Sequence, residues 1–288
     1  GTTGAVTNST GGTFTNSGNT GDWINNGTVT NTGTMANGTN YSDFTNSGTV
    51  GTVDNQGTFT NNNTTGAVTN TGTFTNSGTT TTVTNNTGGT FTNTGNTGDW
   101  LNNATLSNSG TMGNGTNNGT MTNTGTVGTT TNTGTFTNTG TVGAVTNSGT
   151  MSNSGTLGAV TNTGTLTVTG ASQIGNLVNS GTYDATGLTA GSSGRNYTQT
   201  GTGITIIDGN KRYSTNGTAS LAGGIVVNNS PTAIGKYTYF TADSVTGQYD
   251  TLATSSPGNY RLAYTPTAVQ LWLMPDNSVT QGQLNGLA

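Results

Sequence analysis

The sequence of 288 residues contains no cysteine, histidine or glutamate, and it carries few charges of either sign. The absence of cysteine excludes disulfide bonds and thiol chemistry. Only five Lys and Arg residues stand against nine acidic ones, and the net charge is -4. Without a basic stretch, the chain has no electrostatic source of sequence-independent binding to nucleic acid or anionic membranes. No apolar run approaches the ~20 residues of a membrane-spanning helix.

The same absences leave little material for catalysis. A Ser-His-Asp triad cannot be assembled without histidine, which excludes a serine protease of that kind. Paired aspartates could in principle serve a glycosidase, but nothing else in the sequence points to one. Asp208-Gly209-Asn210 predicts a turn, because a full oxygen shell for calcium is not apparent around it. We therefore expect no enzymatic activity, no catalytic residue, no cofactor and no metal site.

Glycine, threonine and asparagine are abundant, and they are arranged in a repeat of 15 residues. An apolar residue flanked by hydroxyl residues returns at this period, with a single step of 17 between two runs. The first run is Phe14, Val29, Phe44, Phe59 and Phe74, and the second is Phe91, Leu106, Met121, Phe136, Met151 and Leu166. Two further columns follow at fixed offsets, namely Met112, Val127, Val142 and Leu157, and Trp100, Val145 and Val160. A short fixed period of this kind is typical of a solenoid.

A longer repeat contains the shorter one. The segment Gly11–Asn40 returns as Gly88–Asn117 at an offset of 77 residues, which equals four steps of 15 and one of 17. Asn-x-Gly sequences separate the short strands, and we expect a left-handed backbone at these corners, which Asn and Gly tolerate. Asn also recurs two residues after the first and third apolar columns. Stacked coils would place these amides ~4.8 Å apart, so we expect side-chain amide ladders.

These patterns predict an all-β protein. Residues 1–180 are expected to form a single-stranded β-solenoid, or β-helix, of ~15-residue coils built from tandem 77-residue blocks. All Pro, Lys and Arg residues lie in the remainder of the chain, where alternating runs predict longer strands. These runs are Gly203–Ile207, Ile225–Asn228, Lys236–Thr241, Arg261–Tyr264 and Ala268–Leu273. We predict that residues 181–288 form a C-terminal β unit and linker that caps the exposed end of the solenoid.

The C-terminal part carries a family resemblance. Four phrases, Asn196–Thr200, Gly217–Gly224, Ser244–Leu252 and Tyr264–Leu271, resemble the end of a bacterial autotransporter passenger. The resemblance implies a right-handed β-helix and an autochaperone-like segment that helps it to fold after outer-membrane passage. It also implies a Gram-negative cell-surface or extracellular protein, tethered to the outer membrane through a translocation barrel outside this chain. Gly1 stands inside a repeat, so we expect the sequence to be a piece of a longer protein.

Two equivalent spots are candidates for ligand binding. The sequence Thr-Gly-Asp-Trp-(Ile/Leu)-Asn occurs once in each 77-residue block and contains Asp22 and Trp23, then Asp99 and Trp100. One interpretation is a pair of sugar sites, each with an aromatic platform beside a carboxylate and amides. The other is that both Trp residues are large members of the third inward column. The sequence leaves both open.

A second candidate is a surface array of threonines. If the apolar residue of Thr-apolar-Thr points inward, its neighbours point outward, ~6.7 Å apart along the strand and ~4.8 Å between coils. The array comprises Thr13, Thr15, Thr28, Thr30, Thr58, Thr60, Thr73, Thr75, Thr90, Thr92, Thr120, Thr122, Thr135 and Thr137. It resembles the ice-binding face of Thr-rich antifreeze solenoids. Alternatively, Thr is simply a good strand former that keeps an uncharged face soluble.

From these features we expect a surface-displayed or secreted adhesin or self-association passenger without enzymatic activity, involved in cell aggregation or biofilm formation. It would act through the repetitive Thr and Asn surface of the β-helix. Its expected partners are copies of itself, or glycans and surface proteins of a host or the environment, and not nucleic acid. The alternatives are an ice-binding solenoid and an extracellular scaffold or filament subunit.

Overall fold

The computed structural model describes residues 1–189 and 195–274, which form strands and turns. The prediction of an all-β, parallel β-solenoid is confirmed. No stretch of these described residues forms a helix of the length and apolar character needed to cross a membrane. The chain divides into two compact units, Gly1–Val142 (unit 1) and Gly143–Ala288 (unit 2).

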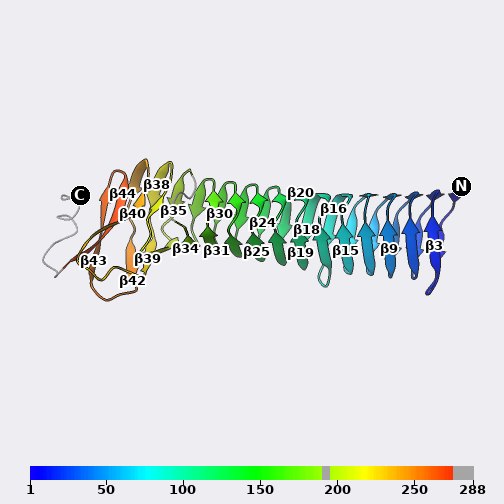
Figure 1. The fold of residues 1–288 in the computed structure, drawn as a ribbon, viewed down its shortest axis with the longest axis horizontal. Coiled ribbons are helices and arrows are strands. Elements are labelled where there is room, and N and C mark those ends of the chain that lie inside the picture. Colours follow the sequence, from blue (N-terminus) through cyan, green and yellow to red (C-terminus); the bar gives the residue numbers. More distant parts are fainter. Residues whose placement is uncertain (190–194, 275–288) are drawn as a thin grey trace. The chain divides into compact units, whose positions relative to one another are not determined.

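Most coils of unit 1 contain three short strands, one on each of three faces. Figure 1 shows the strands of successive coils stacked side by side. The first face consists of β3 (Thr13–Asn16), β6 (Thr28–Asn31), β9 (Asp43–Asn46), β12 (Thr58–Asn61), β15 (Thr73–Asn76), β17 (Thr90–Asn93), β19 (Thr105–Asn108), β22 (Thr120–Asn123) and β25 (Thr135–Asn138). The second face consists of β1 (Thr2–Thr3), β4 (Asn19–Thr20), β7 (Thr34–Met35), β10 (Thr49–Val50), β13 (Thr64–Thr65), β20 (Thr111–Met112), β23 (Thr126–Val127) and β26 (Thr141–Val142). The third face consists of β2 (Val6–Asn8), β5 (Trp23–Asn25), β8 (Gly38–Asn40), β11 (Val53–Asn55), β14 (Val68–Asn70), β21 (Gly115–Asn117) and β24 (Thr130–Asn132). In two coils, β16 (Thr79–Asn85) and β18 (Asn96–Asn102) span the second and third faces.

The apolar columns face a common core, as the 15-residue period predicts. Parallel pairing places Phe59 opposite Phe44 and Phe74, and it places Phe74 opposite Phe91. The rings of Phe59, Phe74 and Phe91 are fully buried and stack face to face, with centroids 5.2 and 5.0 Å apart. Because the three rings are nearly parallel, the ring of Phe74 is covered on both sides by those of Phe59 and Phe91.

Two columns of buried asparagines form the predicted amide ladders. In the first, Asn61 Nδ2 donates to Oδ1 of Asn76 in the next coil at 2.8 Å, and Asn46 Nδ2 donates to Asn61 Oδ1 at 2.7 Å. The second ladder repeats this pattern, for example from Asn55 to Asn70 at 2.7 Å. The same Nδ2 atoms also bond to corner carbonyls of their own and the next coil. Every buried amide is therefore satisfied by its neighbours, as burial of a polar group requires.

The expectation of a left-handed backbone at the Asn-x-Gly corners is wrong. In unit 1, positive φ values occur only at Gly11 (75°) and Gly88 (91°), which lie in the two-residue insertions of the 77-residue blocks. A corner glycine such as Gly72 is required for a different reason. A Cβ atom on Gly72 would lie 2.1 Å from the carbonyl oxygen of Gly57 in the preceding coil. Most corners stack too closely for a side chain, and Ser42, Asn63 and Ala104 are the exceptions at equivalent positions of unit 1.

Unit 2 continues with parallel strands and adds a second kind of sheet. The parallel strands are β27 (Val145–Asn147), β28 (Thr150–Asn153), β29 (Thr156–Leu157), β30 (Val160–Asn162), β31 (Thr165–Gly170), β32 (Gln173–Ile174), β33 (Leu177–Asn179), β34 (Thr182–Leu188), β35 (Tyr197–Gln199), β36 (Ile204–Asp208), β38 (Thr218–Leu221), β39 (Gly224–Asn228), β41 (Ser244–Gly247) and β42 (Thr251–Thr254). The mixed sheet contains β37 (Tyr213–Ser214), β40 (Gly235–Thr241), β43 (Asn259–Thr265) and β44 (Ala268–Met274), with β44 antiparallel to β40 and β43. All five strands expected beyond residue 195 are present.

Parallel pairing does not end near residue 180. Thr182 pairs with Ile204, Ile204 with Gly224, and Gly224 with Thr251, so these coils are longer than the 15 residues of unit 1. Extra residues are accommodated between strands, where they leave the pairing intact but remove the sequence period. The division expected at residue 180 thus coincides neither with the boundary between the compact units nor with the last parallel pair.

Beyond Asn179, tyrosine and glutamine side chains enter the core of unit 2. The hydroxyl of Tyr197 bonds to Gln199 Oε1 and to Thr205 Oγ1 in the interior. Gln199 occupies the position of a ladder asparagine, in register with Asn179, and its Nε2 donates to the carbonyls of Gly203, Ala222 and Gly224, each at 2.8 Å. The longer side chain keeps the corner carbonyls satisfied where the coils have become larger.

We expect unit 2 to unfold in alkaline solution before unit 1. Burial raises the pKa of Tyr213 and of Tyr264 to about 12, whereas unfolded tyrosine titrates near ~10. A raised folded-state pKa means that the stabilisation is complete below pH ~10 and is lost as the pH rises toward ~12. The single tyrosine of unit 1, Tyr41, is half exposed. Hydrogen exchange followed against pH should therefore show loss of protection first in unit 2, and simultaneous loss in both units would contradict this.

Candidate functional site

The two predicted ligand-binding spots lie on equivalent third-face strands, β5 and β18. Trp23 is 3% exposed and Trp100 is 4% exposed. Their indole Nε1 atoms donate to the carbonyl oxygens of Ala36 and Gly113, each at 3.0 Å. Both rings are therefore core residues with satisfied polar atoms, and neither presents an aromatic platform to a sugar.

Each indole lies against a glycine of the next coil. Gly38 is in register with Trp23, and Gly115 is in register with Trp100. A Cβ atom on Gly38 would lie 2.2 Å from Trp23 Cδ2, and one on Gly115 would lie 2.3 Å from Trp100 Cδ2. The wide ring therefore occupies the volume that a side chain would fill at the same position of the next coil. The glycine is the steric complement of the tryptophan.

The aspartates beside these rings cap backbone amides at the coil surface. Asp22 Oδ1 accepts from the backbone N–H of Asn37 at 3.2 Å, and Asn37 Oδ1 accepts from that of Thr52 at 2.7 Å. Asp99 and Asn114 repeat the arrangement in the second block, with distances of 3.0 and 2.8 Å. The carboxylates are exposed, but each already binds a backbone donor of the next coil. Their first role is to accept hydrogen bonds from backbone N–H groups at the corners of the coils.

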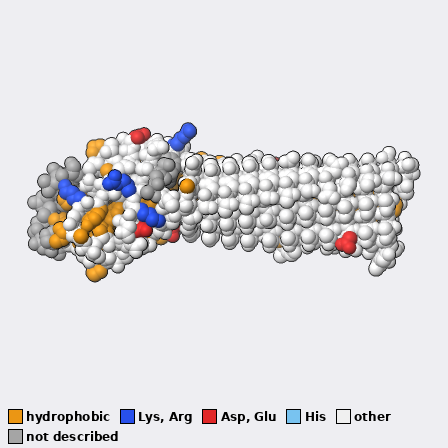
Figure 2. Space-filling view, viewed as in Figure 1, with side chains coloured by type: hydrophobic (Ala, Val, Ile, Leu, Met, Phe, Trp, Pro, Cys, Tyr) orange, Lys and Arg blue, Asp and Glu red, His pale blue; other side chains and the backbone are white. Residues whose placement is uncertain are grey.

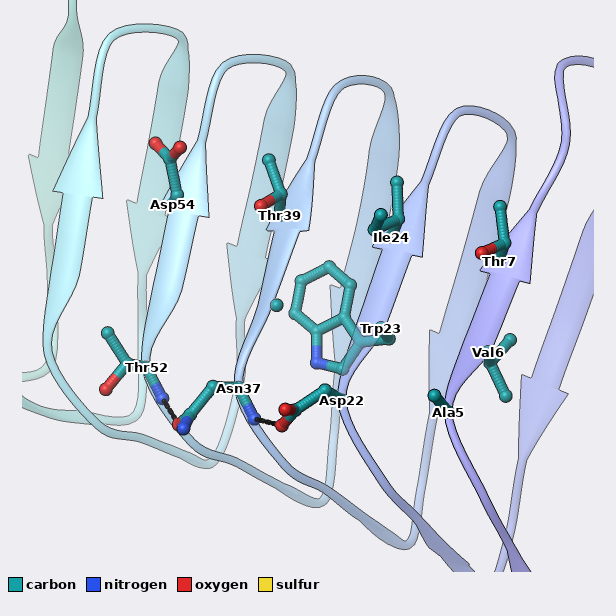
Figure 3. A pocket seen from close by; sticks show the side chains of 11 residues that line it. Ala5, Val6, Thr7, Asp22, Trp23, Ile24, Asn37, Thr39, Thr52 and Asp54 are labelled. Atoms are coloured by element: carbon teal, nitrogen blue, oxygen red, sulfur yellow. Dashed lines mark hydrogen bonds between the residues drawn. The ribbon is translucent and has the colours of Figure 1, made fainter.

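A shallow hollow of about 450 Å³ lies on the third face beside Trp23. Figure 3 shows Asp22, Asn37 and Thr52 along one edge, and Thr7, Ile24, Thr39 and Asp54 along the outward faces of the neighbouring strands. Ile24 is 44% exposed. Because the indole is buried, the hollow offers hydroxyl groups, carboxylates and the aliphatic side chains of Ala5, Val6 and Ile24. This combination is a weak basis for a specific small-molecule site.

The predicted threonine array lies on the first face, in register from coil to coil. Thr13 pairs with Thr28, and the files continue through the later strands of unit 1. The outer file Thr13, Thr28, Thr58, Thr73, Thr90, Thr120 and Thr135 is exposed. In the second file, Thr15, Thr122 and Thr137 are exposed and Thr30, Thr60, Thr75 and Thr92 are half-buried. Asp43 interrupts the outer file, and Thr105 and Ser107 complete the coil between β17 and β22.

Hydroxyl columns also cover the other two faces. On the second face the exposed threonines include Thr34, Thr49, Thr64, Thr79, Thr111, Thr126 and Thr141. On the third face, Thr69 and Thr131 are exposed and Thr39, Thr84 and Thr116 are half-buried. The first face is therefore distinguished by its double file, and not by the presence of threonine. All three faces offer groups that can both donate and accept a hydrogen bond.

Sequence reasoning missed a group of cations in unit 2. Figure 2 shows Lys and Arg side chains gathered over unit 2, whereas unit 1 shows none. Three of the five cations line one hollow of about 300 Å³, here called the basic hollow. It is formed by Gly209, Asn210, Lys211, Arg212, Lys236, Tyr237, Thr238 and Tyr239. The late position of every cation was visible in the sequence, but the antiparallel sheet that brings Lys236 to the turn at 209–212 was not.

Comparison with known proteins identifies no relative. No family model, no curated protein and no solved structure matches the chain. The fold and the side chains described above are therefore the basis for any assignment of function.

Proposed function

We propose that the chain is a non-enzymatic self-association or adhesion module of a bacterial surface protein. The observation that carries this proposal is the set of in-register hydroxyl columns of unit 1, which are long on the first two faces and interrupted on the third by Ile24, Asp54 and Leu101. A hydroxyl both donates and accepts, so a threonine column is complementary to a second copy of itself. Unit 1 carries only Asp22, Asp43, Asp54 and Asp99 as charged side chains, so little repulsion opposes such contact.

The mechanism is additive contact along the coils. Each intermolecular hydrogen bond contributes about 0.5–1.5 kcal/mol net, which is too little for a stable complex. Repetition at ~4.8 Å intervals multiplies the number of simultaneous contacts, and avidity then supplies the strength. The same columns fit the hydroxyl groups of glycans, which are the second partner that we propose, together with surface proteins of a host or the environment.

The cellular setting of the proposal rests on the autotransporter resemblance of residues 195–273. Within that segment Asn196–Thr200 contains β35, and Gly217–Gly224 contains β38, both in the parallel stack of unit 2. A passenger of this kind would be displayed on the surface of a Gram-negative cell or released from it. Cell aggregation and biofilm formation are the processes in which a self-associating surface module would act.

Ice binding is the second candidate, and the double file on the first face favours it. Two threonines per coil, ~6.7 Å apart on a strand and repeated every ~4.8 Å, form a flat hydroxyl lattice. Asp43 breaks this lattice, and the threonines on the other faces show that the residue is not confined to one surface. A scaffold that grows by end-to-end stacking of coils is the third candidate.

We expect self-association to depend weakly on salt and to scale with coil number. Deleting residues 11–87 removes one 77-residue block and keeps the register, because Gly88 replaces Gly11. Since valency falls, beads that display the shortened chain should aggregate several-fold less at equal density. Aggregation of wild-type beads should change little between low salt and 0.5 M NaCl, because uncharged contacts are not screened.

Three lysine substitutions separate this proposal from ice binding. Thr75→Lys, Thr92→Lys and Thr122→Lys together disrupt the double file, and Thr69→Lys with Thr131→Lys places charge on the third face as a control. Ice crystals that become faceted in a nanolitre osmometer with the wild-type protein, and lose their facets only with the first-face variant, would establish ice binding. Absence of aggregation by the wild type would refute self-association.

A further inference from the structure

We propose that the basic hollow of unit 2 binds the sulfate or phosphate groups of an anionic polysaccharide. The chain as a whole is acidic, with a net charge of -4, and yet three of its five cations meet at this place. The remaining cations, Arg195 and Arg261, lie outside the hollow. A local excess of positive charge on an acidic protein attracts an anion without promoting general binding to polyanions.

Lys211 is held by a carboxylate and a backbone carbonyl. Lys211 Nζ lies 3.9 Å from Asp208 Oδ2 and donates to the carbonyl oxygen of Thr186. The other carboxylate oxygen of Asp208 accepts from the backbone N–H of Asn210 at 3.0 Å and from Asn229 Nδ2 at 3.2 Å. This carboxylate therefore holds the turn that carries the cations.

Two of the cations are held in place before any ligand arrives. Asp208 and the Thr186 carbonyl fix Lys211, and Lys236 Nζ lies 3.9 Å from the centroid of the Trp272 ring. Arg212, which also lines the hollow, is exposed. Because two side chains are positioned by other contacts, less conformational entropy is lost when an anion binds. The fold therefore preorganises Lys211 and Lys236 for binding an anion.

The shape and chemistry of the hollow indicate the class of ligand. A planar guanidinium binds two oxygens of a sulfate or phosphate at once, which makes Arg212 the main contact. Thr238 and the backbone of Gly209 add neutral polar groups, and the half-buried Tyr237 adds an aromatic surface. A volume of about 300 Å³ exceeds that of one oxyanion and is sufficient for a substituted sugar ring. A charged saccharide uses all of these groups together.

The test is calorimetric titration of the full chain with a heparin octasaccharide, with its desulfated form, and with a phosphorylated mannan. We expect saturable binding of a charged saccharide and none of the desulfated form. Arg212→Gln should weaken binding about tenfold, because it removes a charge-assisted contact. Arg195→Gln makes the same charge change at an exposed site outside the hollow and should leave the affinity unchanged. Circular dichroism of each variant checks the fold.

The outcomes separate the sources of the anion. Displacement of the bound saccharide by inorganic sulfate but not by phosphate assigns a sulfated ligand, and the reverse assigns a phosphorylated one. Equal weakening by Arg212→Gln and Arg195→Gln would overturn the proposal, because it would show binding to net charge alone. Absence of binding to either charged saccharide would also overturn it. This test does not depend on the threonine columns of unit 1.

Discussion

Replacing Asn61 by Asp should destabilise unit 1 by about 3 kcal/mol or more at neutral pH. The two side chains have the same shape, but Asn61 Nδ2 donates to Asn76 Oδ1 at 2.8 Å and to the carbonyls of Asn63 and Thr79, each at 3.1 Å. A carboxylate would place an oxygen against all three acceptors in a fully buried position. The amide ladder would be broken at one coil, and a charge would be buried without a partner.

The effect should depend on pH with a defined sign. Burial and the surrounding acceptors raise the pKa of the new carboxyl above its ordinary value of ~3.9. A protonated acid can again donate one hydrogen bond. The loss of stability relative to the wild type should therefore be smallest at acid pH and should grow as the pH rises through the raised pKa. Urea unfolding followed by circular dichroism at several pH values measures this.

Asn62→Asp supplies the matched control. Asn62 is the next residue, is exposed, and accepts from Ser77 Oγ at 3.0 Å. The same chemical change there should alter stability by less than about 0.5 kcal/mol. Equal effects at the two positions would show that the ladder does not stabilise the solenoid.

Introducing the consensus residue at Gly38 should be strongly destabilising. Val occupies the same column in later coils, at Val53 and Val68, so Gly38→Val makes the repeat more regular in sequence. In the structure the new Cβ would meet the Trp23 ring at 2.2 Å. We expect the free energy of unfolding to fall by about 3 kcal/mol, because the rigid Trp23 ring cannot move away from the added side chain.

The double variant Trp23→Val, Gly38→Val tests the cause. Trp23→Val alone opens a cavity and should cost about 3 kcal/mol. Together the two changes restore a Val-on-Val stack, so the double variant should be more stable than either single variant. Trp100 and Gly115 offer an independent repetition of the cycle in the second block. Additive losses would show that the two residues do not compensate each other.

The sequence was sufficient for the architecture of unit 1 because every coil repeats the same environment. The 15-residue spacing of Phe44, Phe59 and Phe74 translates directly into parallel register, and the matching Asn spacing translates into ladders. The reason for the corner glycines could not be obtained in this way. It lies in the approach of Gly72 to Gly57, which is a property of the stacked backbone.

Unit 2 was less accessible to sequence reasoning because its coils have unequal lengths. Periodicity detects pairing only when the intervening residues are constant in number, and the step from Gly224 to Thr251 has no counterpart in unit 1. The basic hollow depends on pairing of β40 with β44, which positions Lys236 over Trp272. The candidate sites at Trp23 and Trp100 were ambiguous for another reason. An aromatic residue in a repeat has the same sequence pattern whether its ring is inside or outside.

The ladders also give unit 1 a net side-chain dipole along the stack of coils. From Asn16 to Asn31, and from Asn8 to Asn25, each amide N–H points to the Oδ1 of the following coil, and later coils keep this sense. The side-chain dipoles therefore add along both columns, with amide hydrogens toward the C-terminal coils and oxygens toward the N-terminal ones. This polarity is opposite to that of an α-helix, whose N-terminus is the positive end. Because successive dipoles polarise one another, coils that join the stack in the same sense are favoured over coils that join it reversed.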